Sequence, residues 1–439
     1  MPVPRHGAAA LAVVARTLDK LADPESVAAG VGFPDDPGRR DRPGDAELWS
    51  GLSLGGYPGL ALAFSGTRAT GAGHAERAHA CLRAALGVTG DAAEGSGLHQ
   101  GKGSAAFAVL VAHRATGGYR EALGRFDEYH RILVRKALPR PVTEPAATNG
   151  EFEVIRGLSG IGRHLLARGA ACEPELRAVL SHLVALASGD VVHAGHRVPR
   201  WWALATPRKG REREFAAGHL NFGLAHGITG PLALLSLAWR QGVAVEGQRE
   251  AIENLVGLLE QWAEPDGDGL RWPFHLSLEQ WTGGPRALGL SRQRPSWCYG
   301  APGASRAVQL AALALDRPDW HALAHRSLLP LLERPVTDWG LEDAGLCHGT
   351  AGLLHILGLL GEHIDDARIP AVRDELAALT LAHYREDHRF GFRTAMTGSP
   401  LGADVPGFLE GAAGTALALD AYANGARAHA GWDMALLVN

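Results

Sequence analysis

The chain has 439 residues, of which 46% are hydrophobic and 21% are charged, a balance typical of globular proteins that excludes a disordered chain. Lys and Arg number 43 and Asp and Glu number 47, so the net charge of −4 excludes the basic excess of nucleic-acid-binding proteins. No apolar run approaches the roughly 18 residues of a membrane span, and the four cysteines are too few for a disulfide framework, so we expect a cytoplasmic protein with no membrane segment.

Glycine is the unusual component, at 57 of the 439 residues, which is nearly double its average usage. Many of these glycines belong to a recurring unit, in which a Gly-x-x-Gly turn is followed at once by small apolar residues. Because Ala and Leu dominate these stretches and β-branched runs are scarce, each unit predicts a helix that is apolar nearly all round. Six clear copies begin at Gly56, Gly157, Gly227, Gly300, Gly349 and Gly411, and a weaker copy begins at Gly101.

A second kind of helix, amphipathic and mostly longer, alternates with these units. Two further segments are predicted to be non-helical: a loop rich in Asp, Gly and Pro, and an insert with alternating Val and His residues and a basic end. In chain order we predict an amphipathic helix at Ala8–Leu21, the loop at Pro24–Gly44, amphipathic helices at His74–Leu86, Tyr119–Leu138 and Glu173–Ala187, the insert at Gly189–Phe215, and amphipathic helices at Gln248–Trp262, Trp320–Leu332 and Ala371–Tyr384.

The alternation of the two helix types predicts an all-α fold. Helices with one polar face belong at the surface, whereas Gly- and Ala-rich helices belong inside, where small side chains allow close packing. Seven such pairs closed into a ring make an α/α toroid of seven inner and seven outer helices, as a single domain over 1–439. The alternative is an open helical solenoid. In a closed ring the inner helices all run the same way, so residues just before the turns converge on one rim.

Two of the four cysteines occupy equivalent places before two successive turns. Cys298 lies two positions before Gly300, and Cys347 and His348 lie directly before Gly349. Two thiolates and one imidazole suit zinc, and three protein ligands leave a fourth position open, as in a catalytic site. We therefore predict one zinc ion per chain at these three residues, and the alternative is a pair of buried free cysteines.

The remaining polar residues near the turns divide into candidates and bystanders. His226 directly precedes Gly227, and Glu153 lies four positions before Gly157. Glu410 precedes Gly411 in the same way, and there we expect a helix cap. The other two cysteines, which lie in an amphipathic helix and in a loop, are predicted to take no part in the site.

Three strings make the chain resemble the lanthionine synthetase C-like cyclases: GHLNFGLAHGITGPLALL from Gly218, WCYGAPG from Trp297 and LCHGTAGLLHI from Leu346. The Gly-x-x-Gly turns extend the match over most of the chain, roughly 56–423. The resemblance implies an α/α toroid of seven plus seven helices, in agreement with the helix pattern. It also implies an enzyme, a zinc-dependent lanthionine synthetase of lantibiotic (antibiotic) biosynthesis.

The resemblance assigns roles to single residues. Cys298, Cys347 and His348 match the family's zinc ligands, and His226 matches its catalytic histidine. Arg294 matches the arginine of the RxxWCYG string and completes the predicted catalytic set together with His226 and a carboxylate.

The carboxylate of this set differs from the one that is usual in the family. The family commonly has Asp in a YDVIEG-like string, whereas this chain has FEVIRG, with Glu153 at the acidic position and Arg156 where an acid is usual. The carboxylate is therefore kept but lies one methylene farther from the backbone. Trp297 and Tyr299 match the aromatic residues that flank the first zinc cysteine, so they are predicted to bind substrate, with buried packing as the alternative. The insert at 189–215 matches the place of a small inserted domain, and we predict that it contacts the leader of a peptide substrate.

The family reaction adds a Cys thiolate of a precursor peptide to dehydroalanine or dehydrobutyrine and so forms a thioether ring. The implied partners are a dehydrated lanthipeptide precursor with a leader peptide and a lanthipeptide dehydratase. One alternative is a prenyltransferase-like enzyme, in which zinc also activates a thiol, and another is a non-catalytic thiol- or peptide-binding scaffold. A glycosidase would need two acids at the rim, which the Cys and His residues there disfavour.

Overall fold

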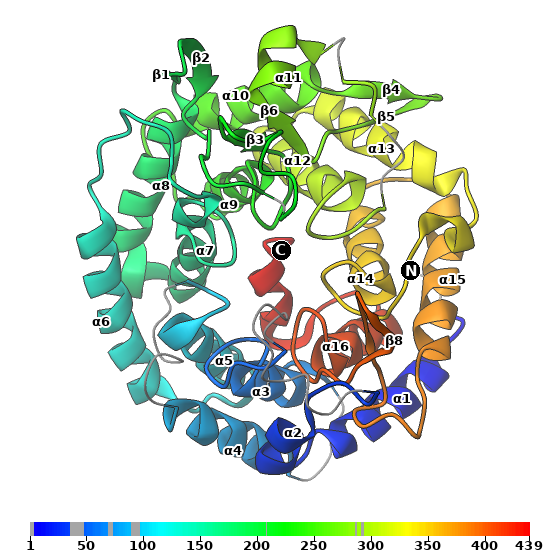
Figure 1. The fold of residues 1–439 in the computed structure, drawn as a ribbon. Coiled ribbons are helices and arrows are strands. Elements are labelled where there is room, and N and C mark those ends of the chain that lie inside the picture. The colour runs from blue at the N-terminus through cyan, green and yellow to red at the C-terminus, as the bar shows by residue number, and fades with distance from the viewer. Residues whose placement is uncertain are drawn as a thin grey trace. The chain divides into compact units, whose positions relative to one another are not determined.

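The computed structural model describes residues 4–35, 48–68, 73–88, 97–207, 209–285, 288–290 and 294–439, most of them in helices (Figure 1). No helix in these ranges is long and apolar enough to cross a membrane. The chain divides into two compact units. The first comprises Met1–Phe126 and Pro335–Asp433, and the second comprises Asp127–Arg334 and Met434–Asn439.

The first unit contains four helices that are buried along most of their length, α3, α5, α14 and α16. Amphipathic helices cover them: α4 packs on α3 and α5, α15 on α14, and α1 on α16 (Figure 1). The elements are α1 (Gly7–Lys20), α2 (Pro24–Gly30), α3 (Tyr57–Gly66), α4 (His74–Leu86), α5 (Gly101–Thr116), α14 (Thr350–Leu360), α15 (Arg368–Ala382), the antiparallel pair β7 (Thr394–Met396) and β8 (Ser399–Ala403), and α16 (Ala412–Ala423).

The second unit repeats this arrangement with three buried helices, α7, α9 and α12. Helix α8 packs on α7, α10 on α9, and α13 on α12. Its helices are α7 (Leu158–Arg168), α8 (Glu173–Ala187), α9 (Thr229–Arg240), α10 (Gln248–Gln261), α11 (Leu278–Gly283), α12 (Ala301–Leu315) and α13 (Pro318–Leu332). Its strands form three antiparallel pairs, β1 (Asp190–His193) with β2 (His196–Pro199), β3 (His219–Asn221) with β6 (His275–Ser277), and β4 (Glu264–Asp266) with β5 (Gly269–Arg271). Helix α6 (Arg120–Ala137) spans the boundary between the units.

The predicted alternation of helices is confirmed among the described residues. Each of the seven Gly-x-x-Gly units is followed by one of the buried helices, and each predicted amphipathic helix is present. The helices predicted at His74–Leu86 and Glu173–Ala187 have those bounds. The helix predicted at Ala371–Tyr384 begins three residues earlier, at Arg368, so that Pro370 lies in its first turn, where proline is tolerated.

The second glycine of the repeat is explained by a close backbone approach. A Cβ atom at Gly303 would lie 2.1 Å from the carbonyl oxygen of Trp297, and one at Gly352 would lie 1.9 Å from the carbonyl oxygen of Leu346. The segment before each buried helix therefore folds directly over the first turn of that helix. Only glycine leaves room for this contact.

The loop prediction at Pro24–Gly44 is wrong in its first part, because Pro24–Gly30 forms α2. The side chain of Asp23 accepts a hydrogen bond from the backbone N–H of Glu25, and Pro24 occupies the first helical position, so two local signals start this helix. Residues 36–47 of the predicted loop lie outside the described part of the chain. The insert at 189–215 contains the β1–β2 hairpin and no helix among its described residues, as predicted.

Candidate active site

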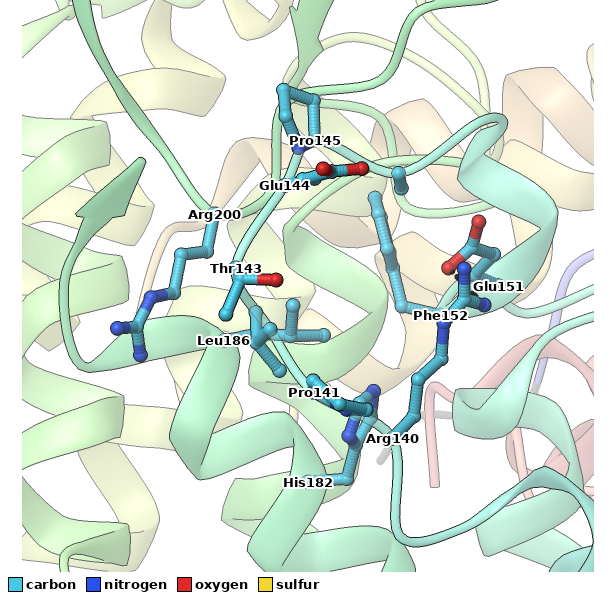
Figure 2. A pocket seen from close by; sticks show the side chains of 12 residues that line it. Arg140, Pro141, Thr143, Glu144, Pro145, Glu151, Phe152, His182, Leu186 and Arg200 are labelled. Atoms are coloured by element: carbon cyan, nitrogen blue, oxygen red, sulfur yellow. Dashed lines mark ion pairs between the residues drawn. The ribbon is translucent and has the colours of Figure 1, made fainter. Parts of the chain in front are cut away.

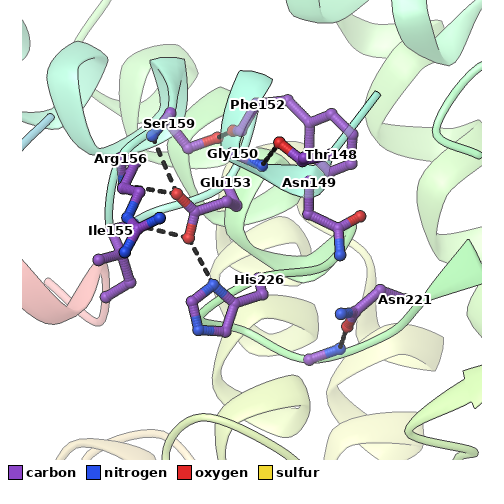
Figure 3. A network of polar contacts seen from close by, with 12 residues as sticks. Thr148, Asn149, Gly150, Phe152, Glu153, Ile155, Arg156, Ser159, Asn221 and His226 are labelled. Carbon is purple, nitrogen blue, oxygen red and sulfur yellow. Dashed lines mark hydrogen bonds and ion pairs between the residues drawn. The ribbon is translucent and has the colours of Figure 1, made fainter. Parts of the chain in front are cut away.

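Glu153 lies in the turn that leads into α7, and its side chain is only 1% exposed. Its Oε1 atom accepts a hydrogen bond from the backbone N–H of Gly157 at 3.0 Å, and its Oε2 atom accepts one from Ile155 at 3.0 Å (Figure 3). The carboxylate thus satisfies backbone donors of the turn that ends at Gly157, the N-cap of α7. These bonds fix the direction in which the carboxylate points.

The same carboxylate holds His226. Its Oε2 atom lies 2.6 Å from Nδ1 of His226, and because an ionised carboxylate only accepts, Nδ1–H is the donor (Figure 3). The imidazole therefore presents Nε2 on its other side, and the side chain is 45% exposed. This pair is the arrangement of a proton-transferring histidine with a carboxylate that orients it.

Backbone hydrogen bonds join three loops of the second unit in series. The N–H of Val154 donates to the carbonyl of Ala225 at 3.0 Å, and the N–H of Ala225 donates to the carbonyl of Cys298 at 3.4 Å. Glu153 directly precedes Val154, and His226 directly follows Ala225. The loops that carry Glu153, His226 and Cys298 therefore form one edge of this unit.

Cys298 sits in a tight turn closed by its own neighbours. The Oγ atom of Ser296 bonds the carbonyl and the N–H of Tyr299 at 2.6 and 2.9 Å, and it lies 3.4 Å from Sγ of Cys298. Gly300 follows with φ of +89°, a conformation that favours glycine, and starts α12. Trp297 is fully buried, and its indole N–H donates to the carbonyl of Leu436 at 2.9 Å. The position of Trp297 favours the packing alternative over substrate contact.

Tyr299 links the Cys298 turn to the loop of His226. Its hydroxyl accepts a hydrogen bond from the side-chain amide of Asn221 at 3.0 Å, and its ring centroid lies 6.4 Å from that of His226. Gly223 permits this approach, since a Cβ there would lie 2.5 Å from the Tyr299 ring. Tyr299 is partly exposed and lies beside the His226 ring, so it remains a candidate for substrate contact.

Cys347 and His348 belong to the first unit, in the turn before α14. The N–H of Cys347 donates to the carbonyl of Leu409 at 2.9 Å, so this turn lies against the turn before α16. Nε2 of His348 lies 3.5 Å from Oε2 of Glu410. Glu410 was predicted to cap α16, but the N-cap residue of that helix is Gly411. One sequence feature could have predicted that Glu410 lies near His348: Glu410 directly precedes Gly411, as His348 directly precedes Gly349.

The other predicted residues fall into two groups. Arg294 is exposed in the second unit, beside a small cavity of about 40 Å³ that Gly300 also lines. Cys81 and Cys172 are buried, and burial raises the pKa of each thiol to about 12. Neither thiol ionises near neutral pH, which fits their prediction as bystanders.

A separate cavity of about 340 Å³ lies behind the Glu153 turn in the second unit (Figure 2). Phe152 and Glu151 line one side of it, and His182 of α8 lines another. Arg140 also lines the cavity and forms an ion pair of 2.5 Å with Glu151. Glu153 and His226 do not line this cavity, because the Glu153 side chain turns toward the helix N-terminus instead.

Comparisons with known proteins give a consistent result. The family model described as lanthionine synthetase C-like protein matches residues 52–437. The nisin biosynthesis protein NisC of Lactococcus lactis subsp. lactis is 23% identical over 309 residues, which is 69% of this chain and 71% of that protein. The solved structure of nisin cyclase matches with a TM-score of 0.73 and 21% identity, covering 89% of this chain and 92% of that chain. The predicted fold class, an α/α toroid, is confirmed by this structural match.

Proposed function

The chain belongs to the lanthionine synthetase C-like protein family, and from this premise we propose that it is a zinc-dependent cyclase that forms lanthionine and methyllanthionine rings. In this reaction a cysteine thiol of a peptide adds to the β-carbon of dehydroalanine or dehydrobutyrine. One S–C bond forms, the C=C double bond becomes single, and the thiol proton is balanced by a proton gained at the α-carbon. The product therefore has the same mass as the dehydrated peptide.

The observation that carries this proposal is the pair of His226 and Glu153 on the edge that also bears Cys298. A thiol addition needs a group that accepts the thiol proton and a group that supplies a proton to the resulting enolate. Nε2 of His226 is the nitrogen available for both proton transfers, because Nδ1–H donates a hydrogen bond to Glu153. General acid–base catalysis of this kind contributes about 10²- to 10⁴-fold to a rate.

Two further residues have proposed roles toward the substrate. The exposed guanidinium of Arg294 supplies a fixed positive charge that would stabilise the developing enolate. Tyr299 would contact the peptide beside His226.

The proposed zinc ligands are Cys298, Cys347 and His348, a group of described residues whose side chains could hold a metal ion. The donor set fits zinc, because two thiolates and one imidazole are ligands that zinc prefers, and three protein ligands leave a position for substrate. Two thiolates also balance the charge of the ion. When bound, zinc would ionise a coordinated substrate thiol, which as a free cysteine side chain has a pKa near 8.5.

The proposed partners follow from the same chemistry. The substrate is a dehydrated lanthipeptide precursor with a leader peptide, and a lanthipeptide dehydratase would supply it. The insert at 189–215 is proposed to contact the leader. The cytoplasmic location and the single-domain organisation over 1–439 stay predictions.

The test combines zinc analysis with a ring-forming assay. We expect purified protein to hold about one zinc per chain and to consume the free thiol of a dehydrated precursor peptide at constant mass. Cys298→Ala and Cys347→Ala should lose both zinc and activity, because each removes a ligand. Cys172→Ala is the matched control, since it removes a buried thiol that is not a proposed ligand.

Each rival function has its own outcome in this assay. A gain of a prenyl mass would replace the proposal with a thiol-prenylating enzyme. Peptide binding without loss of thiol would indicate a binding scaffold. Full ring formation by metal-free protein would contradict the role of zinc.

A further inference from the structure

Glu410 lies beside a proposed zinc ligand in the first unit, His348, and its position follows from the repeat. Glu410 precedes Gly411, the N-cap of α16, as His348 precedes Gly349, the N-cap of α14. Helices α14 and α16 pack against each other, so the two turns lie side by side. Equivalent positions in neighbouring repeats therefore bring an imidazole and a carboxylate together.

Backbone and side-chain contacts hold the two turns in this register. The N–H of Cys347 donates to the carbonyl of Leu409, and the hydroxyl of Thr415 donates to the carbonyl of Ala344 at 3.0 Å. A Cβ atom at Gly345 would lie 3.2 Å from the carbonyl oxygen of Leu409, so glycine keeps the turns close.

Strand β7 forms hydrogen bonds with both turns. The hydroxyl of Thr394 donates to the carbonyl of Glu410. The N–H of Ala395 donates at 3.1 Å to the carboxylate of Asp343, which also accepts the N–H of Gly345 at 2.9 Å. The backbone positions of Glu410 and of the turn that carries His348 are thus fixed by the same strand.

From this arrangement we infer that Glu410 is a positioning residue for His348, whose Nε2 faces the carboxylate and whose Nδ1 is the metal ligand. Nε2 lies 3.5 Å from Oε2 of Glu410, and that oxygen is shielded from solvent. A carboxylate on the second ring nitrogen fixes the tautomer and the ring orientation of a metal-binding histidine and increases its basicity as a ligand. This role rests on the zinc proposal above, but it concerns a residue that the ligand set does not include.

The test measures metal affinity without substrate. Zinc dissociation constants of wild type, Glu410→Gln and Glu410→Asp are obtained by competition with a chromophoric chelator, and absorption spectra are recorded with cobalt(II) in place of zinc. Loss of such a partner costs about 10- to 100-fold in metal affinity, so Glu410→Gln should bind zinc that much more weakly and show altered cobalt bands. Glu410→Asp, which keeps the charge, should recover part of the affinity.

Glu362→Gln is the control, because it removes an exposed carboxylate of the same unit just beyond the other end of α14. It should bind zinc as wild type does. Wild-type affinity and cobalt bands in Glu410→Gln would overturn the inference. A loss of zinc affinity that accompanies a lowered unfolding temperature of the metal-free variant would also overturn the inference, because lost stability would then explain the weaker binding.

The outcomes for wild type separate this inference from the proposed function. A wild type that binds zinc but forms no thioether overturns the proposed function alone, because the affinity comparison needs no substrate. A wild type that binds no zinc overturns both.

Discussion

The side chain of Glu153 compensates for its extra methylene by folding back onto the turn that precedes α7. An aspartate at this position would have a shorter reach, whereas Glu153 spans the distance to His226 while its two oxygens accept backbone N–H groups. The departure from the family's usual Asp is therefore compatible with a carboxylate–histidine pair. The geometry depends on a charged acceptor, because all of its partners are donors.

We predict that Glu153→Gln lowers the rate of thiol consumption by about 100-fold, since the amide replaces an acceptor with a donor facing His226 Nδ1. The same change should lower the free energy of unfolding by about 1 kcal/mol, because the backbone N–H groups of the turn before α7 lose a charged acceptor. Rates are measured by thiol titration and stability by urea denaturation. Glu151→Gln, two residues away, is the control for the rate, and an unchanged rate in Glu153→Gln would refute the role of the pair.

At the scale of elements, the glycines of the Gly-x-x-Gly repeat allow close packing between each loop and the buried helix that follows it, in addition to forming a turn. The first glycine begins the buried helix, and the second allows the preceding loop to cross the first turn of that helix at backbone contact distance. Because Trp297 and Cys298 lie in such a loop, the contact at Gly303 also fixes the loop that carries a proposed zinc ligand.

We predict that Gly303→Ala lowers the free energy of unfolding by about 3 kcal/mol, because the new methyl group would overlap the carbonyl oxygen of Trp297. Gly257→Ala in α10 is the matched control in the same unit. A Cβ atom there meets nothing within 4 Å, so alanine should raise the free energy of unfolding by about 0.5–1 kcal/mol through its higher helix propensity. Equal effects of the two substitutions in urea denaturation would contradict the close-contact explanation.

At the scale of the whole molecule, buried histidines make folding sensitive to acid. Burial lowers the pKa of His219 to about 4, and its Nε2 lies 3.0 Å from the side-chain amide of Asn149, which suits a neutral ring. Burial also lowers the pKa values of further histidines in both units. They are His182, His321, His383, His388 and His429. Asp420 acts in the opposite direction, since burial raises its pKa to about 6.

The sign of the pH effect follows from proton uptake. A histidine whose folded pKa is lowered binds fewer protons in the folded state than in the unfolded state between about pH 4 and 6.5, so stability falls as the pH falls. We predict that His219 alone removes about 2 kcal/mol of the free energy of unfolding between pH 7 and pH 5. Urea denaturation of wild type and His219→Gln at both pH values measures this, and an equal pH dependence in the two proteins would disprove it.

The amino-acid sequence by itself determined the two helix types, their order and the residues placed at the turns. These features are local: helical periodicity, capping glycines and proline positions depend on neighbours within a few residues. They were sufficient for an all-α fold of paired helices and for naming His226, Glu153 and the two cysteines near the turns, but they left an open helical solenoid as the alternative to a closed α/α toroid. The helix at Pro24–Gly30 was missed although Asp23 and Pro24 are local start signals, because the segment was grouped with the Asp-, Gly- and Pro-rich residues that follow it.

Only the tertiary structure decided which side chains meet. Glu153 and His226 are 73 positions apart, and their contact depends on how the α7 and α9 turns stack. The same holds for His348 with Glu410, and for Trp297, whose buried indole N–H donates to the carbonyl of Leu436, 139 positions away. Such contacts join segments that local patterns treat as independent, because packing between helices, and not the sequence near each residue, sets their distances.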